Sequence, residues 1–178
     1  MTSGPGAPGR PSEPAGTATS IHIRRASIGF AAAHFNCLDG GRELLHGHNY
    51  TVGLTAHGEV RADGAIVDFA HLKEALRGEC AELDHRMLVP TRSTDVAVER
   101  LPDGHVSLVY RDGARFLFPQ GDCAFLPLPN ATCEALAGHL LGRLRRRLGE
   151  LPVVLEVAVE EAPGQGAVAT EAGVAPVA

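Results

Sequence analysis

Three histidines have the type and spacing of residues that hold a metal ion. His46 and His48 stand two apart in the stretch "LHGHNYT", and His34 lies near the end of the earlier stretch "FAAAHF". Successive side chains of a strand point to opposite faces, so residues two apart share a face. On a strand predicted for about 45–59, both histidines therefore lie at one end of the apolar face that looks toward the core.

A second strand, predicted for about 21–35, carries the third histidine. If the two strands pair as a hairpin, His34 lies across from His46 and His48, and three imidazoles converge. Three protein ligands with a fourth position open form the pattern of a catalytic zinc site, where the ion polarises a bound oxygen. The alternative is that all three are hydrogen-bonded polar residues of a strand. A cupin also uses His-x-His, but it needs a carboxylate slightly later on that strand, where "NYTVGL" has none.

The elements that must position these residues belong to an α+β fold. Besides the two strands, apolar spacing and turn residues predict two helices, a β-hairpin and a last strand, at about 69–83, 132–148, 105–118 and 153–161. Asp68 and Thr132 are the predicted N-caps of the helices, and the hairpin turns on Asp112–Gly113. This order favours an antiparallel sheet with helices on one face over a doubly wound parallel sheet.

Composition divides the chain and excludes some partners. Residues 1–20 are rich in Gly, Pro, Ser and Ala and predict a disordered tail, residues 21–163 the folded domain, and residues 164–178 a flexible C-terminal tail. The net charge of −5 and the absence of tryptophan argue against a nucleic-acid partner. We interpret the basic cluster at 143–147 as a solvated helix face.

The same composition gives an expected location. No apolar run approaches membrane-spanning length, and the N-terminus lacks the apolar core of a secretory signal. The four cysteines are scattered, with no C-x-x-C pair, which is typical of a protein in a reducing compartment. We therefore expect a cytoplasmic protein with no membrane partner.

Several motifs together resemble one known family. "FAAAHF", "LHGHNYTV", "GAIVDFAHLKEAL", "LDHRML" and "NATCEALAGHL" occur in the order typical of the 6-pyruvoyl-tetrahydropterin synthase and 6-carboxytetrahydropterin synthase family. The resemblance covers residues 28–162. It implies the tunnelling fold, a four-stranded antiparallel sheet with two helices on one face, here with an inserted β-hairpin. It also implies a pterin substrate and a homo-hexamer built as a dimer of trimers, with active sites between subunits.

The resemblance also assigns site residues. It gives Zn2+ to the three histidines, and it makes Asp84 and His85 a proton-transfer pair that can serve the neighbouring subunit. We expect that carboxylate to be buried beside its histidine. Glu161 matches the glutamate that anchors the pterin ring, and it continues the buried face of the last strand, which Glu160 does not. Thr132 matches a residue that can touch the pterin, although capping explains it equally well.

One departure from the family bears on the reaction. Most members place a reactive cysteine four residues before the first histidine of His-Gly-His, where this chain has Arg42. An arginine is no base at neutral pH, but it could bind a substrate phosphate. Cys37 is shifted by five positions and is expected to be inert. Glu43 is the better catalytic candidate, because one branch of the family carries E-x-x-H-G-H and removes side-chain carbons from dihydroneopterin. The alternative for Glu43 is a solvated loop carboxylate.

These residues predict a zinc-dependent pterin lyase acting on a dihydroneopterin side chain, with 6-hydroxymethyl-dihydropterin as one expected product. Two alternatives stay open within the family, the 6-carboxytetrahydropterin synthase and 6-pyruvoyl-tetrahydropterin synthase reactions on dihydroneopterin triphosphate. A third alternative is a non-catalytic protein that binds a pterin or zinc. The insertion at 91–125 has no function that the sequence shows.

Overall fold

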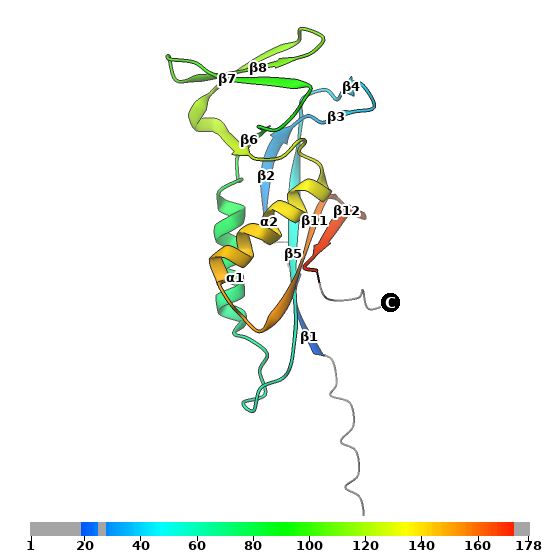
Figure 1. The fold of residues 1–178 in the computed structure, drawn as a ribbon, viewed down its shortest axis with the longest axis vertical. Helices are drawn as coiled ribbons and strands as arrows, with labels where there is room; N and C mark the ends of the chain where they lie inside the picture. Colours follow the sequence, from blue (N-terminus) through cyan, green and yellow to red (C-terminus); the bar gives the residue numbers. More distant parts are fainter. Residues whose placement is uncertain (1–18, 25–27, 173–178) are drawn as a thin grey trace, which may run out of the picture.

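The computed structural model describes residues 19–24 and 28–172 (Figure 1). Its main sheet has seven strands in the order β10-β6-β2-β5-β11-β12, with β1 also paired to β5. These strands are β1 (Thr19–Ile23), β2 (Gly29–His34), β5 (His46–Gly58), β6 (Arg86–Pro90), β10 (Cys123–Leu126), β11 (Val153–Ala162) and β12 (Gln165–Thr170). Two helices, α1 (Phe69–Ala81) and α2 (Cys133–Leu148), pack on the sheet and complete one hydrophobic core.

Strand β5 is the centre of the sheet. Along one side it pairs antiparallel with β11, and along the other it pairs with β1 and then with β2. The single strand predicted for 21–35 is therefore wrong, because it is two strands that pair with different halves of β5. The alternation of buried residues along β5 agrees with the predicted apolar face.

The α+β class is confirmed, and the sheet is larger than the four antiparallel strands expected. Strand β6 pairs parallel to β2, and β10 pairs parallel to β6, so the chain after α1 extends the sheet beyond β2. At the other edge, β12 pairs antiparallel with β11. Parallel neighbours require long crossover connections, which short-range sequence patterns do not reveal.

The prediction of a flexible tail from residue 164 is wrong where the chain forms the strand β12. Its small residues Ala167 and Ala169 pack against the core, and Arg145 binds Glu171 just after the strand, with Nε and Oε1 2.6 Å apart. Glu171 Oε2 also accepts the backbone N–H of Leu155 at 2.9 Å. These contacts compensate for the weak apolar pattern of this segment. Of the predicted N-terminal tail, residues 1–18 lie outside the described residues, and β1 begins at Thr19.

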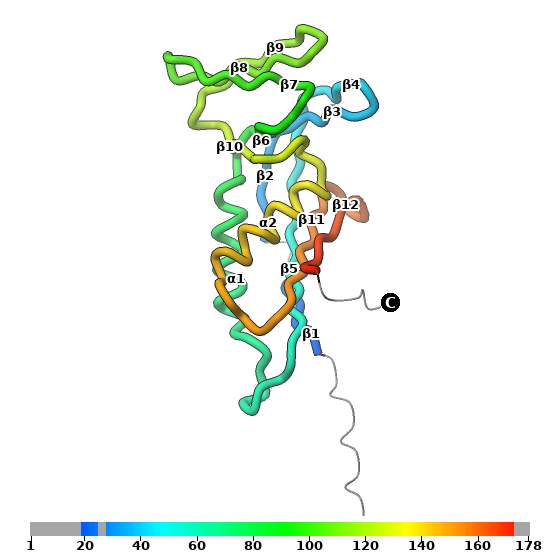
Figure 2. The backbone as a smooth tube through the Cα atoms, viewed as in Figure 1, coloured from blue at the N-terminus to red at the C-terminus, as the bar shows by residue number. Residues whose placement is uncertain are grey.

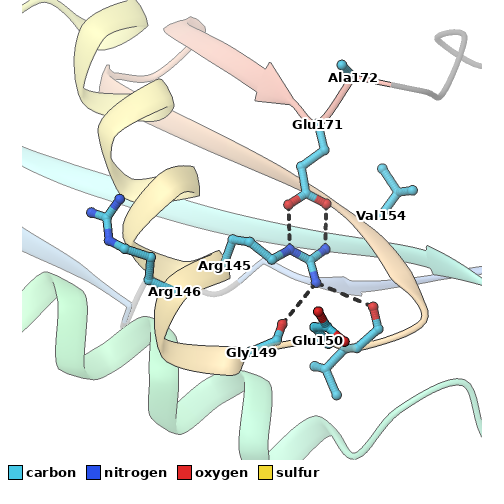
Figure 3. A pocket seen from close by; sticks show the side chains of 8 residues that line it. Arg145, Arg146, Gly149, Glu150, Val154, Glu171 and Ala172 are labelled. Carbon is cyan, nitrogen blue, oxygen red and sulfur yellow. Dashed lines mark hydrogen bonds and ion pairs between the residues drawn. The ribbon is translucent and has the colours of Figure 1, made fainter.

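Figure 3 shows the hollow beside this ion pair, with the Arg145 and Glu171 side chains facing each other across it. It has a volume of about 670 Å³ and is lined by residues at the end of α2, the start of β11 and the end of β12. The start of β11 pairs with the end of β5, whereas the histidines lie at the start of β5. The hollow is therefore separate from the predicted site.

A second sheet lies at the histidine end of the molecule, beside the short hairpin β3 (Cys37–Leu38) and β4 (Gly41–Arg42) (Figure 2). It has three strands, β7 (Val96–Arg100), β8 (His105–Tyr110) and β9 (Arg115–Pro119). The predicted hairpin on Asp112–Gly113 is confirmed as β8–β9, and β7 adds a third strand that the sequence did not indicate. A separate apolar cluster joins this sheet to Phe35 and to β6.

Both helices begin where their N-caps predict. Asp68 Oδ1 accepts the N–H of Ala70 at 2.8 Å, and Thr132 Oγ1 accepts that of Ala135 at 3.3 Å. No helix within 19–24 and 28–172 combines the length and apolar character that crossing a membrane requires.

A buried carboxylate joins the two helices. Glu79 of α1 is 2% exposed and pairs with Arg143 and Arg147 of α2, the latter with Nε 2.5 Å from Oε1. Burial opposes ionisation, but the hydrogen bonds from both arginines outweigh it and hold the pKa of Glu79 below its usual value. We predicted that the basic cluster of α2 is a solvated helix face. This prediction is wrong in part, because the arginines of the cluster bind partners on α1 and beside β12.

Replacing Glu79 with Gln removes the charge that both arginines pair with. We expect the free energy of unfolding to fall by about 3 kcal/mol, at the lower end for a broken buried pair because both arginines still reach water. Urea denaturation measures this change. Glu74→Gln, on the exposed side of the same helix, is the matched control and should change stability by less than about 0.5 kcal/mol. Equal stability of the two variants would contradict the role given to Glu79.

Candidate active site

The pairing of β2 with β5 brings the three histidines together. His34 lies directly opposite His46, and Ala32 lies opposite His48, so all three imidazoles fall on the same side of two adjacent strands. Gly47, between the two histidines of β5, lies against the backbone of β2, where a Cβ would come within 3.2 Å of the Ala32 carbonyl oxygen. The predicted convergence is therefore present in the structure.

The trio has the dimensions of a metal site. One ligand nitrogen from each histidine lies within 4.8 Å of the other two. The ring centroid of His34 lies 4.6 Å from that of His46 and 5.3 Å from that of His48. The centroids of His46 and His48 are 4.9 Å apart. His34 is fully buried, whereas His48 is half-buried and His46 exposed. The cluster is thus closed on the His34 side and open on the His46 side.

The hydrogen bonds of these rings fit a bound cation. The buried Nδ1 of His34 has no hydrogen-bond partner in the described part of the chain. His46 Nδ1 lies 2.7 Å from the Leu44 carbonyl oxygen, to which it can donate, and this leaves its Nε2 free as a ligand. Burial, together with the neighbouring histidines, lowers the pKa of His34 and keeps its ring neutral, the form that binds metals.

Tyr50 is a member of the site that the sequence analysis did not single out. Its hydroxyl lies 3.1 Å from His34 Nε2, and its ring stacks on Phe30 with centroids 4.7 Å apart. Burial raises the pKa of Tyr50, so the hydroxyl stays neutral, and its oxygen can accept the Nε2–H of His34 in the tautomer that leaves Nδ1 free for a metal. The signal was available, because Tyr50 follows His46 and His48 on the same face of β5.

Glu43 lies beside the trio and is not an unattached loop residue. Its backbone N–H donates to the Asn36 carbonyl at 2.9 Å, and its Oε2 accepts the N–H of Asn36 at 3.0 Å. Asn36 is two residues beyond His34. The charge of Glu43 raises the pKa of His34, against the larger effect of burial. The exposed Glu43 carboxylate is therefore attached to the backbone two residues beyond His34, since two hydrogen bonds join Glu43 to Asn36.

Arg42 and Cys37 lie on the hairpin β3–β4, just before Glu43, and both contact other residues of the protein. The guanidinium of Arg42 lies over three aromatic rings, so its contact with a substrate phosphate stays a prediction. The backbone of Cys37 is bound on both sides by the Asn130 side chain, at 3.2 and 3.0 Å. Burial raises the pKa of the Cys37 thiol, which disfavours the reactive thiolate.

Asp84 and His85 form a pair, but not in the surroundings we predicted. Asp84 Oδ2 lies 2.9 Å from His85 Nδ1, and Asp84 Oδ1 accepts the N–H of Ala31 at 2.8 Å. The backbone hydrogen bond and the contact with His85 lower the pKa of Asp84. The side chains are 42% and 83% exposed, so the expectation of a buried carboxylate is wrong. The turn after α1 presents both groups to solvent, and the sequence could not show this.

Glu161 stands at an irregularity of the sheet. The pairing of β11 with β12 shifts between Glu160 and Ala162, so Glu161 is the extra residue of a β-bulge, a feature that re-aims a side chain. It hydrogen-bonds Cys133, and burial together with this carboxylate raises the pKa of the Cys133 thiol to about 12. Its charge also acts, weakly, to raise the pKa of His34 against the larger effect of burial. Thr132 caps α2, as the capping explanation predicts.

The comparisons with known proteins agree with this arrangement. A family model described as 6-pyruvoyl tetrahydropterin synthase matches residues 23–172. The chain belongs to this family. A Methanocaldococcus jannaschii protein, provisionally named 6-carboxy-5,6,7,8-tetrahydropterin synthase, is 31% identical over 147 residues, which cover 80% of this chain and 89% of that protein. The predicted family resemblance is therefore confirmed.

Two further relatives bear on the fold and on the chemistry found in the family. A solved Plasmodium vivax 6-pyruvoyltetrahydropterin synthase structure has a TM-score of 0.83 at 28% identity, covering 87% of this chain and 98% of that one, which confirms the tunnelling fold. That structure and a second one of the same enzyme carry alanine or cysteine in place of a glutamate described as a catalytic residue. A Pyrococcus furiosus dihydroneopterin monophosphate aldolase is 41% identical over 66 residues, 37% of this chain and 54% of that protein.

The bulge that carries Glu161 depends on a glycine in the neighbouring strand. A Cβ at Gly166 would lie 2.4 Å from the Val159 carbonyl oxygen and 2.9 Å from the Glu160 Cα. We expect Gly166→Ala to push β12 from β11 and to lower the free energy of unfolding by about 1–3 kcal/mol in urea denaturation. Gly121→Ala is the control, since a Cβ there meets nothing within 4 Å. A Gly166→Ala variant as stable as that control would contradict the close packing described here.

Proposed function

We propose that this protein is a zinc-dependent lyase that cleaves a carbon–carbon bond in the side chain of dihydroneopterin or its monophosphate and releases 6-hydroxymethyl-dihydropterin. The observation that carries the proposal is the attachment of Glu43 by two hydrogen bonds to Asn36, two residues beyond His34. The glutamate described as catalytic in the Plasmodium vivax enzyme and the aldolase name of the Pyrococcus furiosus relative support it.

The histidine trio would hold the metal. His34, His46 and His48 offer three imidazole nitrogens, a donor set that suits zinc. When bound, a zinc ion with an open position acts as a Lewis acid toward the hydroxyl groups of the substrate side chain. The Leu44 carbonyl fixes the orientation of His46, and the Tyr50 hydroxyl that of His34.

Glu43 would act as the base of the cleavage. It removes the proton from the hydroxyl on the second side-chain carbon, and a carbonyl forms there as the bond to the first side-chain carbon breaks. The electron pair passes into the pterin ring system, and the first carbon is then protonated. The second product is a two-carbon aldehyde, phosphorylated if the substrate was the monophosphate. Because a base must lie within hydrogen-bond reach of its proton, the tether to Asn36 is central to this assignment.

Glu161 would bind the pterin ring. A partly buried carboxylate requires hydrogen-bond donors, and the ring N–H and amino group of a pterin supply two of them. Its position on the bulge of β11 and the effect of its charge on His34 support a ring bound next to the reacting side chain.

Asp84 and His85 would serve the site of a neighbouring subunit. Their exposed side chains point to solvent in one chain, which agrees with a shared site in a homo-hexamer made of two trimers. Strands β10 and β12 end the main sheet, and pairing of such edges between subunits closes a sheet into a barrel.

The alternatives differ in what they require at the family's cysteine position. The 6-carboxytetrahydropterin and 6-pyruvoyl-tetrahydropterin synthase reactions on dihydroneopterin triphosphate normally use that cysteine. Arg42 stands in its place and lies over aromatic rings, while the pKa of Cys37 is raised by burial. The chemistry of these side chains thus favours Glu43 as the base, and with it the proposed cleavage over the synthase reactions. A non-catalytic pterin-binding or zinc-binding protein is the remaining alternative.

Metal analysis tests the trio without reference to activity. We expect one zinc ion per chain by elemental analysis, and a metal content reduced at least about tenfold by His48→Ala because the third ligand is lost. Removal of the metal with a chelator should lower the melting temperature, since a ligand that binds only the folded state stabilises it. His57→Ala, on β5 but away from the trio, should keep its zinc. Full metal content in His48→Ala would contradict the assignment.

Turnover tests the role of Glu43. We expect Glu43→Gln to lower kcat on dihydroneopterin or its monophosphate at least about 100-fold, the usual contribution of a general base, with zinc content unchanged. The product, 6-hydroxymethyl-dihydropterin, is followed by liquid chromatography. Glu59→Gln, an exposed carboxylate beyond the other end of β5, is the matched control.

The outcomes separate the candidate functions. Undiminished turnover by Glu43→Gln would remove this residue from the mechanism. A carboxy or pyruvoyl product from dihydroneopterin triphosphate, with no product from the other two substrates, would favour the synthase reactions instead. Bound pterin and zinc without turnover of any of the three substrates would favour the non-catalytic alternative.

A further inference from the structure

We propose that Arg42 is a positioning residue for Glu43, and that the second sheet β7–β9 is the platform that holds Arg42. This inference rests on the proposed function, in which Glu43 is the catalytic base. Under this inference Arg42, which stands at the family's cysteine position, contributes to the same reaction. The insertion that forms the second sheet contributes through Arg42.

The side chain of Arg42 is enclosed by aromatic rings. Its guanidinium carbon lies 5.1 Å from the ring centroid of Phe116, 5.7 Å from that of Phe35 and 5.9 Å from that of Tyr110. A guanidinium is attracted to ring faces at these distances, and its planar form suits stacking. Two of the three rings, Phe116 on β9 and Tyr110 on β8, come from the second sheet.

The same side chain holds the backbone at Glu43. Arg42 Nη1 donates to the Glu43 carbonyl at 2.7 Å. The N–H and Oε2 of Glu43 bond the backbone of Asn36. The residue is therefore fixed at its N–H, its carbonyl and one carboxylate oxygen. Its Oε1 has no hydrogen-bond partner within residues 19–24 and 28–172, so one oxygen is left to accept a proton.

The second sheet also holds the turn before Arg42. Tyr110 Oη donates to the Gly40 carbonyl at 3.3 Å and accepts from Arg111 Nε at 3.1 Å, while Arg111 pairs with Asp95 at 3.0 Å. Gly40 has a φ of +80°, which favours glycine and makes the turn sharp. The second sheet thus contacts the hairpin β3–β4 at two points, the turn and the Arg42 side chain.

Beyond Glu43, the Leu44 carbonyl is hydrogen-bonded to His46, but apolar packing does not support the segment. Leu44 is 80% exposed and Leu45 is 40% exposed, so neither anchors the segment through apolar packing. The hold on Glu43 therefore comes from Asn36 on one side and from Arg42 on the other. Losing the Arg42 contact should let the carboxylate move relative to the histidines, and a displacement of about 1 Å can lower a rate about 100-fold.

Steady-state kinetics of Arg42→Met in the zinc-loaded full chain test this. We expect kcat to fall about 10- to 100-fold with KM changed less than about twofold, with zinc content unchanged. In the Glu43→Gln background, Arg42→Met should lower kcat no further, because Arg42 acts through Glu43. Phe116→Leu, which removes the nearest ring, should lower kcat in the same manner but less. Arg100→Met is the matched control, since its guanidinium lies 4.1 Å from the Phe125 ring but contacts nothing in the hairpin.

Three results would overturn the inference: unchanged kcat in Arg42→Met, a change in KM alone, or a loss that adds fully to that of Glu43→Gln. If Arg42→Met folds poorly, Arg42→Lys decides under the same criteria, because it keeps the charge and loses the planar fork. If Glu43→Gln itself is fully active, the proposed function fails and takes this inference with it. An inactive Glu43→Gln beside a fully active Arg42→Met removes the inference alone.

Discussion

The site depends on the register in which β2 pairs with β5. His34 meets its chemical partners because it lies opposite His46, and a shift of one residue would turn either strand's histidines to the other face. The register is secured by the apolar side chains that share this face, including Phe30, which stacks on Tyr50. The register of β2 with β5 therefore determines both the packing of the core and the placement of the imidazoles.

Around this fixed pair of strands, three separate parts of the chain supply the remaining groups. Glu43 comes from the segment that joins the two strands, Glu161 from a bulge at the end of β11, and two of the three rings around Arg42 from the inserted sheet. Each is held by backbone hydrogen bonds or ring contacts rather than by burial alone. Such supports keep polar side chains in place at the open rim of a site, where apolar packing is thin.

The sequence predicted what depends on local spacing. The histidine face, both helix caps and the Asp112–Gly113 turn follow from periods and turn residues, and the structure confirms them. It did not predict the parallel neighbours of β2 or the strand β12. These depend on contacts between distant segments, such as Arg145 with Glu171, that no local pattern encodes.

The site residues divide along the same line. The resemblance to the family nominated Glu43, through the E-x-x-H-G-H pattern, and Glu161, which also continues the buried face of the last strand. The exposure of Asp84 and His85 was not readable, since it arises from a turn in which His85 has a φ of +57°. The three aromatic rings around Arg42 were equally hidden, because Phe35 lies far along the chain from Tyr110 and Phe116.

The placement of the strands along the chain also orders the assembly of the site in time. The three histidines lie on strands that are near neighbours in sequence, whereas Glu161 lies on β11, after both helices and the inserted sheet. During synthesis the chain emerges from its N-terminus, and nearby segments pair before distant ones. The imidazole cluster can thus be complete on a nascent chain well before β11, which carries Glu161, has been made.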